Sequence, residues 1–205
     1  MPLTAYGALA YRLASLGSLP AAHEAAERAV DANPSSDSYR VFGWVCYLKG
    51  ALDDALTAFR AGLAIEPDDA TLLANAGELL AFRGDATALG LLERSMVGGR
   101  VTTLWSWIYA GVLHRQAGDE AAARRYFVEC AERGAESATF SDLECAGIAL
   151  VALGERQRAI SLVRNALPRR YPTFGSPDER AYAFLHSDEM DGLDEIQRLV
   201  AGAPL

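Results

Sequence analysis

Residues 36–69 read SDSYRVFGWVCYLKGALDDALTAFRAGLAIEPDD, and the fold of the chain can be inferred from their pattern. Apolar residues recur at helical spacing on both sides of Gly50, and Pro67 follows the second run. A glycine just past a helical run ends the helix, because glycine adopts the left-handed backbone at little cost. The stretch therefore predicts two helices joined by a short turn at Gly50.

The same arrangement recurs along the whole chain with a period close to 34 residues. The glycines of the period stand 33, 34, 34 and 36 residues apart, at Gly17, Gly50, Gly84, Gly118 and Gly154. Seven residues before each glycine is a small residue: Ala10, Gly43, Gly77, Gly111 and Gly147. In the third unit the pattern after the glycine is shifted by one residue, which implies a one-residue deletion in its turn. Such a period indicates stacked helix pairs, because one pair alone cannot bury this much apolar surface.

This pattern resembles the tetratricopeptide (TPR) repeat. The segment 36–69 carries the signature positions Tyr39, Phe42, Gly43, Tyr47, Gly50, Ala55, Phe59 and Pro67. We divide residues 1–171 into five repeats, at about 3–35, 36–69, 70–103, 104–139 and 140–171. The resemblance implies an all-α fold, a right-handed α-solenoid of stacked antiparallel helix pairs with a concave inner face. The third and fourth units have Val101 and Ala135 in place of the closing proline, which predicts joints that are looser or differently bent.

The segment 172–205 breaks the period. Ser176, Pro177, Asp178 and Glu179 have the features of a helix start, with an N-cap, a proline at the first position and acids in the first turn. We expect one helix to about His186 and a second from about Met190 to Ala201, closed by Gly202. We interpret them as helices that cap the final repeat. The alternative is an acidic docking helix, or a segment that folds back over the inner face.

Composition and charge limit the classes of partner and the compartment. The net charge is −8 and there is no basic cluster, which argues against a nucleic-acid partner. No apolar run approaches the ~20 residues that span a bilayer, and no secretory signal is present, so we expect no membrane insertion and a cytoplasmic location. Three isolated cysteines suit a reducing compartment. Apart from Lys49 every basic residue is arginine, which indicates a GC-rich bacterial genome.

No constellation for catalysis, a cofactor or a metal is evident. The chain lacks the G-x-G-x-x-G fingerprint, a P-loop, a C-x-x-C pair and a G-x-S-x-G elbow. His23 and Glu27 share a helix face and could hold a metal weakly, but a solvated polar face is favoured. His114 is interpreted as a helix-packing residue. We therefore predict no catalytic residue, no cofactor and no metal, and an enzyme of unrecognised type is the least favoured alternative.

The inner face is the candidate binding site. In TPR geometry the first helix of each repeat lines this face, and six of its positions carry aromatic residues: Tyr11, Trp44, Tyr47, Phe82, Trp105 and Tyr109. The other residues of the predicted partner-binding set are Arg40, Asn75, Glu78, Ile108, Val112, Arg115 and Ile148. A large exposed apolar patch usually marks an interaction site, so we favour a groove for an apolar peptide or helix over simple tight closure of the superhelix. Arg40 and Arg115 would hold a carboxylate or a carbonyl at its edges.

Two functions remain open at this point. The favoured function is a non-catalytic adaptor, scaffold or chaperone that binds a segment of another protein in the aromatic groove. The alternative is a self-assembling TPR module that forms homo-oligomers through its repeat ends or groove, because the first helix carries Tyr6, Leu9 and Leu13. A carboxylate clamp for chaperone tails is disfavoured, since only Asn75 is suitably placed. The identity of the partner is not encoded in the repeat pattern.

Overall fold

The computed structural model describes residues 5–97, 103–169, 179–188 and 190–202. These residues form α-helices and short stretches of 3-10 helix, and they contain no strand. The α-helices are α1 (Ala5–Ser15), α2 (Leu19–Ala32), α3 (Ser36–Leu48), α4 (Leu52–Ile65), α5 (Ala70–Phe82), α6 (Ala88–Ser95), α7 (Trp105–Gln116), α8 (Glu120–Ala135), α9 (Phe140–Ala152), α10 (Arg156–Ala166), α11 (Glu179–His186) and α12 (Leu193–Ala201). A 3-10 helix, Leu167–Arg169, follows α10. The expected helix start at residues 176–178 lies outside the described residues.

The turn inside each helix pair is the same, and it confirms the role predicted for the periodic glycines. All five have a left-handed backbone, with φ between +66° and +82°. In the second pair, the N–H of Ala51 donates to the carbonyl of Cys46 at 2.9 Å and that of Gly50 donates to Tyr47 at 3.0 Å. These two bonds form a Schellman motif, which satisfies carbonyls that the end of a helix would otherwise leave unpaired.

The two helices of a pair approach closely at the small residue that precedes the turn. A Cβ atom on Gly111 of α7 would lie 2.6 Å from the Phe127 ring of α8, so only glycine fits there. In the third pair Leu92 fills the corresponding space over Gly77, one residue earlier than the regular pattern. This shift agrees with the deletion inferred from the sequence, and the second helix of this pair, α6, is short.

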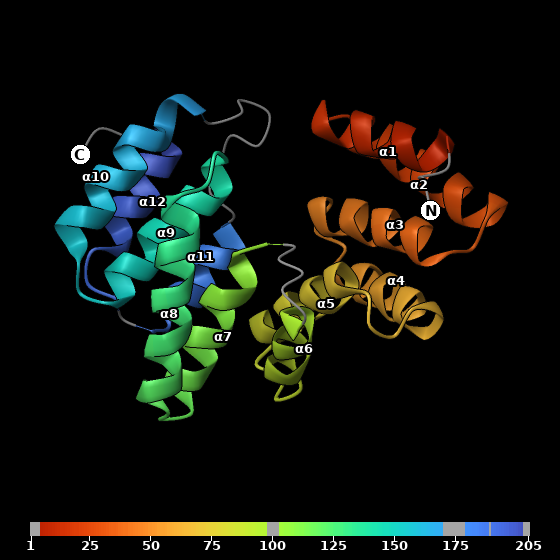
Figure 1. Ribbon diagram of the computed structural model, residues 1–205. Coiled ribbons are helices and arrows are strands. Elements are labelled where there is room, and N and C mark those ends of the chain that lie inside the picture. Colours follow the sequence, from red (N-terminus) through yellow and green to blue (C-terminus); the bar gives the residue numbers. More distant parts are fainter. Residues whose placement is uncertain (1–4, 98–102, 170–178, 189, 203–205) are drawn as a thin grey trace.

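The helices stack in two layers, as Figure 1 shows. The first helices of the pairs, α1, α3, α5, α7 and α9, lie side by side, while the second helices, α2, α4, α6, α8 and α10, are farther from one another. A stack that is crowded on one side curves toward that side, so the first helices form the inner face. The all-α solenoid fold predicted from the repeat is thereby confirmed.

The C-terminal helices occupy two different places on this stack. Helix α12 packs against α9 and α10 and closes the last helix pair, as a cap would. Helix α11 lies against α5, on the inner side of the curve. The segment therefore combines the capping arrangement with the alternative in which part of it folds back over the inner face.

The joint after the fourth pair is tighter than expected. Ala135 ends α8, and a Cβ atom on the neighbouring Gly134 would lie 2.8 Å from the Cβ of Ala146 in α9. Of the two expectations for this joint, looser or differently bent, the looser one is therefore wrong. Val101, at the third joint, lies outside the described residues.

Within the described ranges, no helix combines the length and the apolar character needed to cross a bilayer.

Candidate functional site

The N-terminal part of the inner face carries an open aromatic surface. The rings of Tyr11 on α1 and Trp44 on α3 stack with their centroids 5.0 Å apart and an interplanar angle of 22°. Tyr11 is 48% exposed and Trp44 is half-buried. The two residues stand at the same position of successive repeats, six before the turn glycine, and therefore point the same way from adjacent helices. We call this pair the Tyr11–Trp44 surface.

Polar residues of the predicted set flank this surface. Arg40 on α3 is half-buried, and its guanidinium lies 2.8 Å from the carboxylate of Asp37, one helical turn earlier. Asn75 and Glu78 on α5 are also half-buried. Tyr47, near the end of α3, is half-buried, and the guanidinium of Arg180 from α11 lies 4.3 Å from the centre of its ring.

The middle of the inner face holds a cluster of four aromatic residues. The rings of Phe82 (α5) and Tyr109 (α7) meet edge to face with centroids 5.5 Å apart, and Phe184 of α11 contacts both rings at 6.0 and 5.5 Å. Trp105 stacks on Tyr109 at 5.7 Å, and its indole N–H donates to the hydroxyl of Ser141 at 3.3 Å. The aromatic stripe predicted for α5 and α7 therefore exists, but one of its partners comes from α11.

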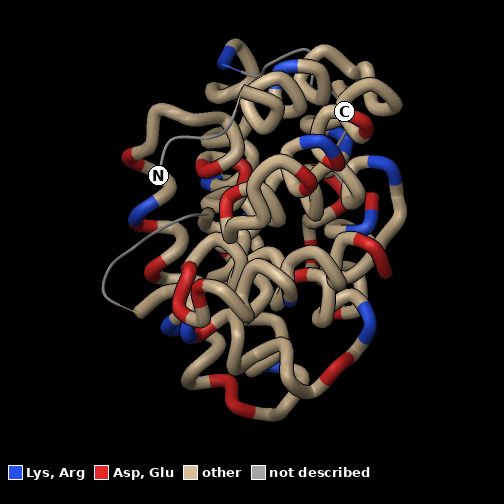
Figure 2. Tube along the Cα trace, turned by 90° about the vertical axis from the view of Figure 1, so that its right-hand side faces the viewer, with Lys and Arg blue, Asp and Glu red and all other residues tan. Residues whose placement is uncertain are grey.

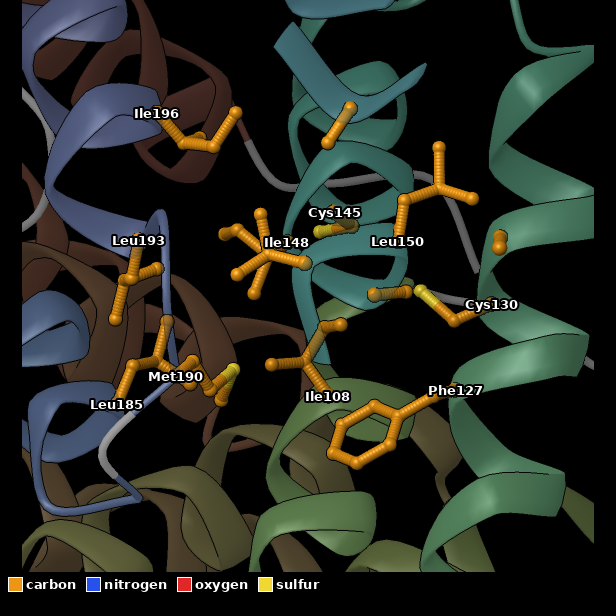
Figure 3. Packing of buried hydrophobic residues seen from close by; sticks show 14 of the residues in the cluster. Ile108, Phe127, Cys130, Cys145, Ile148, Leu150, Leu185, Met190, Leu193 and Ile196 are labelled. Carbon is orange, nitrogen blue, oxygen red and sulfur yellow. The ribbon is translucent and has the colours of Figure 1, made fainter. Parts of the chain in front are cut away.

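The C-terminal part of the inner face is sealed, which corrects part of the predicted groove. Ile108, Tyr109, Val112 and Ile148 are at most 2% exposed, whereas the sequence analysis placed them on an open lining. Figure 3 shows Ile108 and Ile148 facing Leu185, Met190, Leu193 and Ile196 of the C-terminal segment. The expectation was wrong at these four positions because the segment that breaks the repeat period covers α7 and α9. This half agrees with the other alternative named for the C-terminal segment, in which part of it folds back over the inner face.

Arg115 fixes the closed arrangement from the end of α7. Its guanidinium lies 2.8 Å from Asp188, in the turn between α11 and α12, and donates to the carbonyl of Ala152 at 3.0 Å. It also lies 4.7 Å from the centre of the Phe127 ring. Burial raises the pKa of the Asp188 carboxyl above its ordinary value, and the charge of Arg115 acts in the opposite direction. Arg115 thus holds an internal carboxylate, where the sequence analysis predicted one from a partner.

A buried hydrogen bond connects α11 to α9. The hydroxyl of Tyr182 donates to the carboxylate of Glu144 at 2.9 Å, and both side chains are buried. Burial, together with the negative charge of Glu144, raises the pKa of Tyr182 well above its ordinary value. The phenol therefore stays protonated and can act as the donor that the buried carboxylate needs.

Three residues of α11 belong to this site although the predicted binding set did not include them. Arg180, Tyr182 and Phe184 all contact inner-face residues, but none was in the predicted set. A signal was available, because two aromatic residues and Leu185 within two helical turns are unusual for a helix that only faces solvent. The strong acidity of the residues that follow α11 instead favours a solvated cap.

The remaining titratable groups pack between helices or face solvent. The imidazole of His114 lies 3.1 Å from Glu93 and stacks on Tyr126 at 5.3 Å, which agrees with the packing role predicted for it. His23 and Glu27 lie 3.5 Å apart on α2. All three cysteines are buried, and burial raises the pKa of Cys46 to about 11. No group of three or more His, Cys, Asp or Glu residues within the described ranges is placed to hold a metal ion.

Charged residues are dispersed over the surface. Figure 2 shows acidic and basic residues interspersed along the described trace, with several pairs of opposite sign side by side. Arg83 and Asp53 form one such pair at 2.7 Å, and Arg94 and Asp68 form another at 2.9 Å. The excess negative charge of −8 is therefore spread over the surface and is not gathered at one site.

Comparison with solved structures identifies the fold. TTC0263, a TPR protein from Thermus thermophilus, has a TM-score of 0.63 and 17% identity, over 90% of this chain and 97% of its own. YrrB, a TPR protein with an unusual peptide-binding site, has a TM-score of 0.56 and 19% identity, over 92% of each chain. A chain of the APC/C hetero-tetramer Cut9–Hcn1 has a TM-score of 0.64 and 16% identity, over 98% of this chain and 40% of its own.

No protein-family model and no curated protein matches the sequence. The structural likeness extends over nearly the whole chain at identities below 20%, and it therefore concerns the fold. The turn glycines, the close approach at the small residues and the layered stacking all agree with it. This chain has the fold of the tetratricopeptide-repeat proteins.

Proposed function

We propose that this chain is a non-catalytic protein-interaction module that binds an apolar segment of another protein on the Tyr11–Trp44 surface. The observation that carries the proposal is the exposed aromatic stack on the inner face, next to a C-terminal half that is closed. Tyrosine and tryptophan offer a large contact area at a low cost in rotamer entropy, which is why they are frequent at binding hot spots. An adaptor, a scaffold and a chaperone would all use such a surface in the same way.

Two of the structural neighbours support this proposal by analogy. YrrB has a peptide-binding site, and Cut9 and Hcn1 occur together in a hetero-tetramer. The analogy concerns the class of function only, because proteins of one fold serve many purposes. We also propose that the repeats run as the sequence divides them, so that the surface lies on the first two repeats and the partner enters from the N-terminal end.

The test is a peptide selection on the intact chain. Peptides selected from a random phage-displayed library on the wild-type protein are measured by fluorescence anisotropy against the double variant Tyr11→Ala/Trp44→Ala. We expect Kd to rise at least tenfold, since loss of a hot-spot aromatic residue costs about 2 kcal/mol or more.

Tyr6→Ala is the matched control for this selection. Tyr6 lies on the same helix as Tyr11 and is 41% exposed, but no stacking partner is found for it among the described residues. The control should bind the selected peptides like the wild type. The proposal fails if the library yields no binder, or if the double variant retains the wild-type affinity.

Self-assembly is the second candidate, and the exposed face of α1 favours it. Tyr6 and Leu9 of α1 are 41% and 48% exposed, and Leu16, directly after α1, is 69% exposed. If two copies associate through this face, analytical ultracentrifugation should detect a dimer that Leu9→Asp abolishes. A wild-type protein that remains monomeric at several hundred micromolar would remove this candidate.

A further inference from the structure

Helix α11 is placed on the inner face in the way that a bound peptide would be. It lies against α5 and, through its side chains, reaches α3, α7 and α9. The second helices of the repeats, by contrast, pack on the first helix of their own pair and on the first helix of the next pair. The contacts of α11 with the inner face are made by few side chains, and each of them can be examined separately.

Arg180 makes the contact closest to the open half. Its guanidinium lies 4.3 Å from the centre of the Tyr47 ring and donates to the backbone carbonyl of Tyr47 at 3.2 Å. An arginine over an aromatic face combines a cation–π contact with a hydrogen bond, and both depend on its planar, charged head. Tyr47 belongs to the predicted binding set, so α11 already uses part of the site.

Phe184, one turn further along, enters the aromatic cluster. Residues four apart lie on one side of a helix, so Arg180 and Phe184 act together. Phe184 meets Phe82 and Tyr109 with ring centroids 6.0 and 5.5 Å apart. Beside it, Tyr182 donates to Glu144, and Leu185 is fully buried. The occupant of this site thus presents an arginine, a tyrosine and a phenylalanine in five residues.

The contacts that hold α11 can also be distinguished from those that hold the segments next to it in the sequence. Helix α12 packs on α9 and α10, whereas the close helix contact of α11 is with α5. The turn after α11 is tied independently, because Asp188 pairs with Arg115 and Ser187 accepts from the side-chain amide of Gln116 at 2.9 Å. With eight residues, α11 is too short to be a stable helix on its own, so the inner face must template it.

We propose that the inner surface covered by α11 is a binding site for a short amphipathic helix, and that α11 is its internal occupant. The fitting partner helix carries an arginine, an aromatic residue four positions later and an apolar residue after that. This proposal rests on the proposed function and adds a regulation to it: a partner helix of this chemistry competes with α11. The apparent affinity of such a partner is reduced by the fraction of molecules whose site is occupied by α11.

The experiment measures exchange of α11 with a peptide of its own sequence. A fluorescein-labelled synthetic peptide of residues 179–186 is titrated with the full-length wild type and with full-length Arg180→Ala/Phe184→Ala. The variant weakens the internal helix, so we expect its Kd for the wild-type peptide to be at least tenfold lower. A peptide carrying the same two substitutions should not bind. Arg198→Ala on α12, an exposed arginine that leaves α11 intact, should behave like the wild type.

Hydrogen exchange on the wild type provides a test that needs no variant. If α11 is an exchangeable occupant, its amides should exchange at least tenfold faster than those of α9, through a local opening that leaves α9 folded. Equal peptide affinity in the wild type and the variant, or exchange of α11 only together with α9, would overturn the proposal. Either result would make α11 a fixed part of the core.

The outcomes also separate this inference from the proposed function. If library-selected peptides bind the Tyr11–Trp44 surface but the α11 peptide does not exchange, the regulation is wrong and the proposed function stands. If the α11 peptide exchanges but no foreign peptide is ever retained, the internal site is real and the proposed function is wrong. Concentration-dependent dimerisation of the wild type that Arg180→Ala/Phe184→Ala lacks would identify a second copy of α11 as the competing helix.

Discussion

Along the stack, the side chain at one position of the repeat changes from exposed to buried. The residue six before the turn glycine is Tyr11 in the first repeat and Trp44 in the second, both on the open half of the inner face. In the fourth and fifth repeats it is Val112 and Ile148, which are fully buried under the C-terminal segment. The repeat therefore determines the direction of a side chain, while its environment depends on a segment outside the repeats.

Truncating the side chain six residues before the turn glycine should give the largest difference in stability between the open and the closed half. Ile148→Ala leaves a cavity among α9, α11 and α12, and we expect it to lower the free energy of unfolding by about 2–5 kcal/mol. Tyr11→Ala removes a half-exposed side chain and should cost less than about 1 kcal/mol. Urea denaturation followed by circular dichroism measures both. Equal costs would contradict the division into an open and a closed half.

Breaking an ion pair should also lower the free energy of unfolding more in the closed half than in the open half. Arg115→Ala leaves Asp188, whose side chain is only 4% exposed, without its guanidinium and also removes the contacts to Ala152 and Phe127. We expect a loss of about 2–3 kcal/mol, mostly from the stranded carboxylate. Arg40→Ala breaks a more exposed pair within one helix and should cost below about 1 kcal/mol. Thermal denaturation of both variants is the measurement, and a larger effect for Arg40 would refute this ranking.

Alkaline pH should destabilise the closed half through Tyr182. The pKa of this phenol is raised in the folded state, so the unfolded chain loses the proton first once the pH exceeds about 10. The resulting loss of stability amounts to about 1.4 kcal/mol per pH unit until the folded-state pKa is reached. Tyr182→Phe should make this slope smaller in urea denaturation between pH 9 and pH 11. The part of the slope that remains comes from the buried cysteines and Tyr126, whose pKa values are also raised. Tyr11→Phe is the control from the open half, and it should leave the slope unchanged.

The helix pairs could be predicted from the sequence because local chemistry determines them. Glycine at position 50 and its equivalents is required by the left-handed turn, and Gly77 with Leu92 records the deletion in the third unit. The coverage of the inner face could not be predicted in the same way. Val112 and Ile148 have the spacing of lining residues whether or not another helix packs on them, and only the path of the chain after residue 169 decides this.

The residues of the predicted binding set also divide between the open and the closed half of the inner face. Tyr11, Trp44 and Arg40 lie near one another on adjacent helices, as their repeat positions indicate. Arg115 lies at the expected edge of the inner face, yet its partner is Asp188 of the same chain. An arginine at the edge of the inner face needs a hydrogen-bond acceptor. The sequence does not reveal whether that acceptor belongs to the same chain or to a partner.

The contact of Arg180 with Tyr47 has a consequence for the mechanics of the molecule. An array in which every unit touches only its neighbours stretches like a spring and can lose its units one at a time. Arg180 joins α11 to a residue 133 positions earlier in the chain, so it acts as a strut across the curve. A force applied to the two ends of the molecule then acts on the Arg180–Tyr47 contact before the repeats between α3 and α11 separate. The elastic compliance of the molecule rises abruptly when this contact breaks.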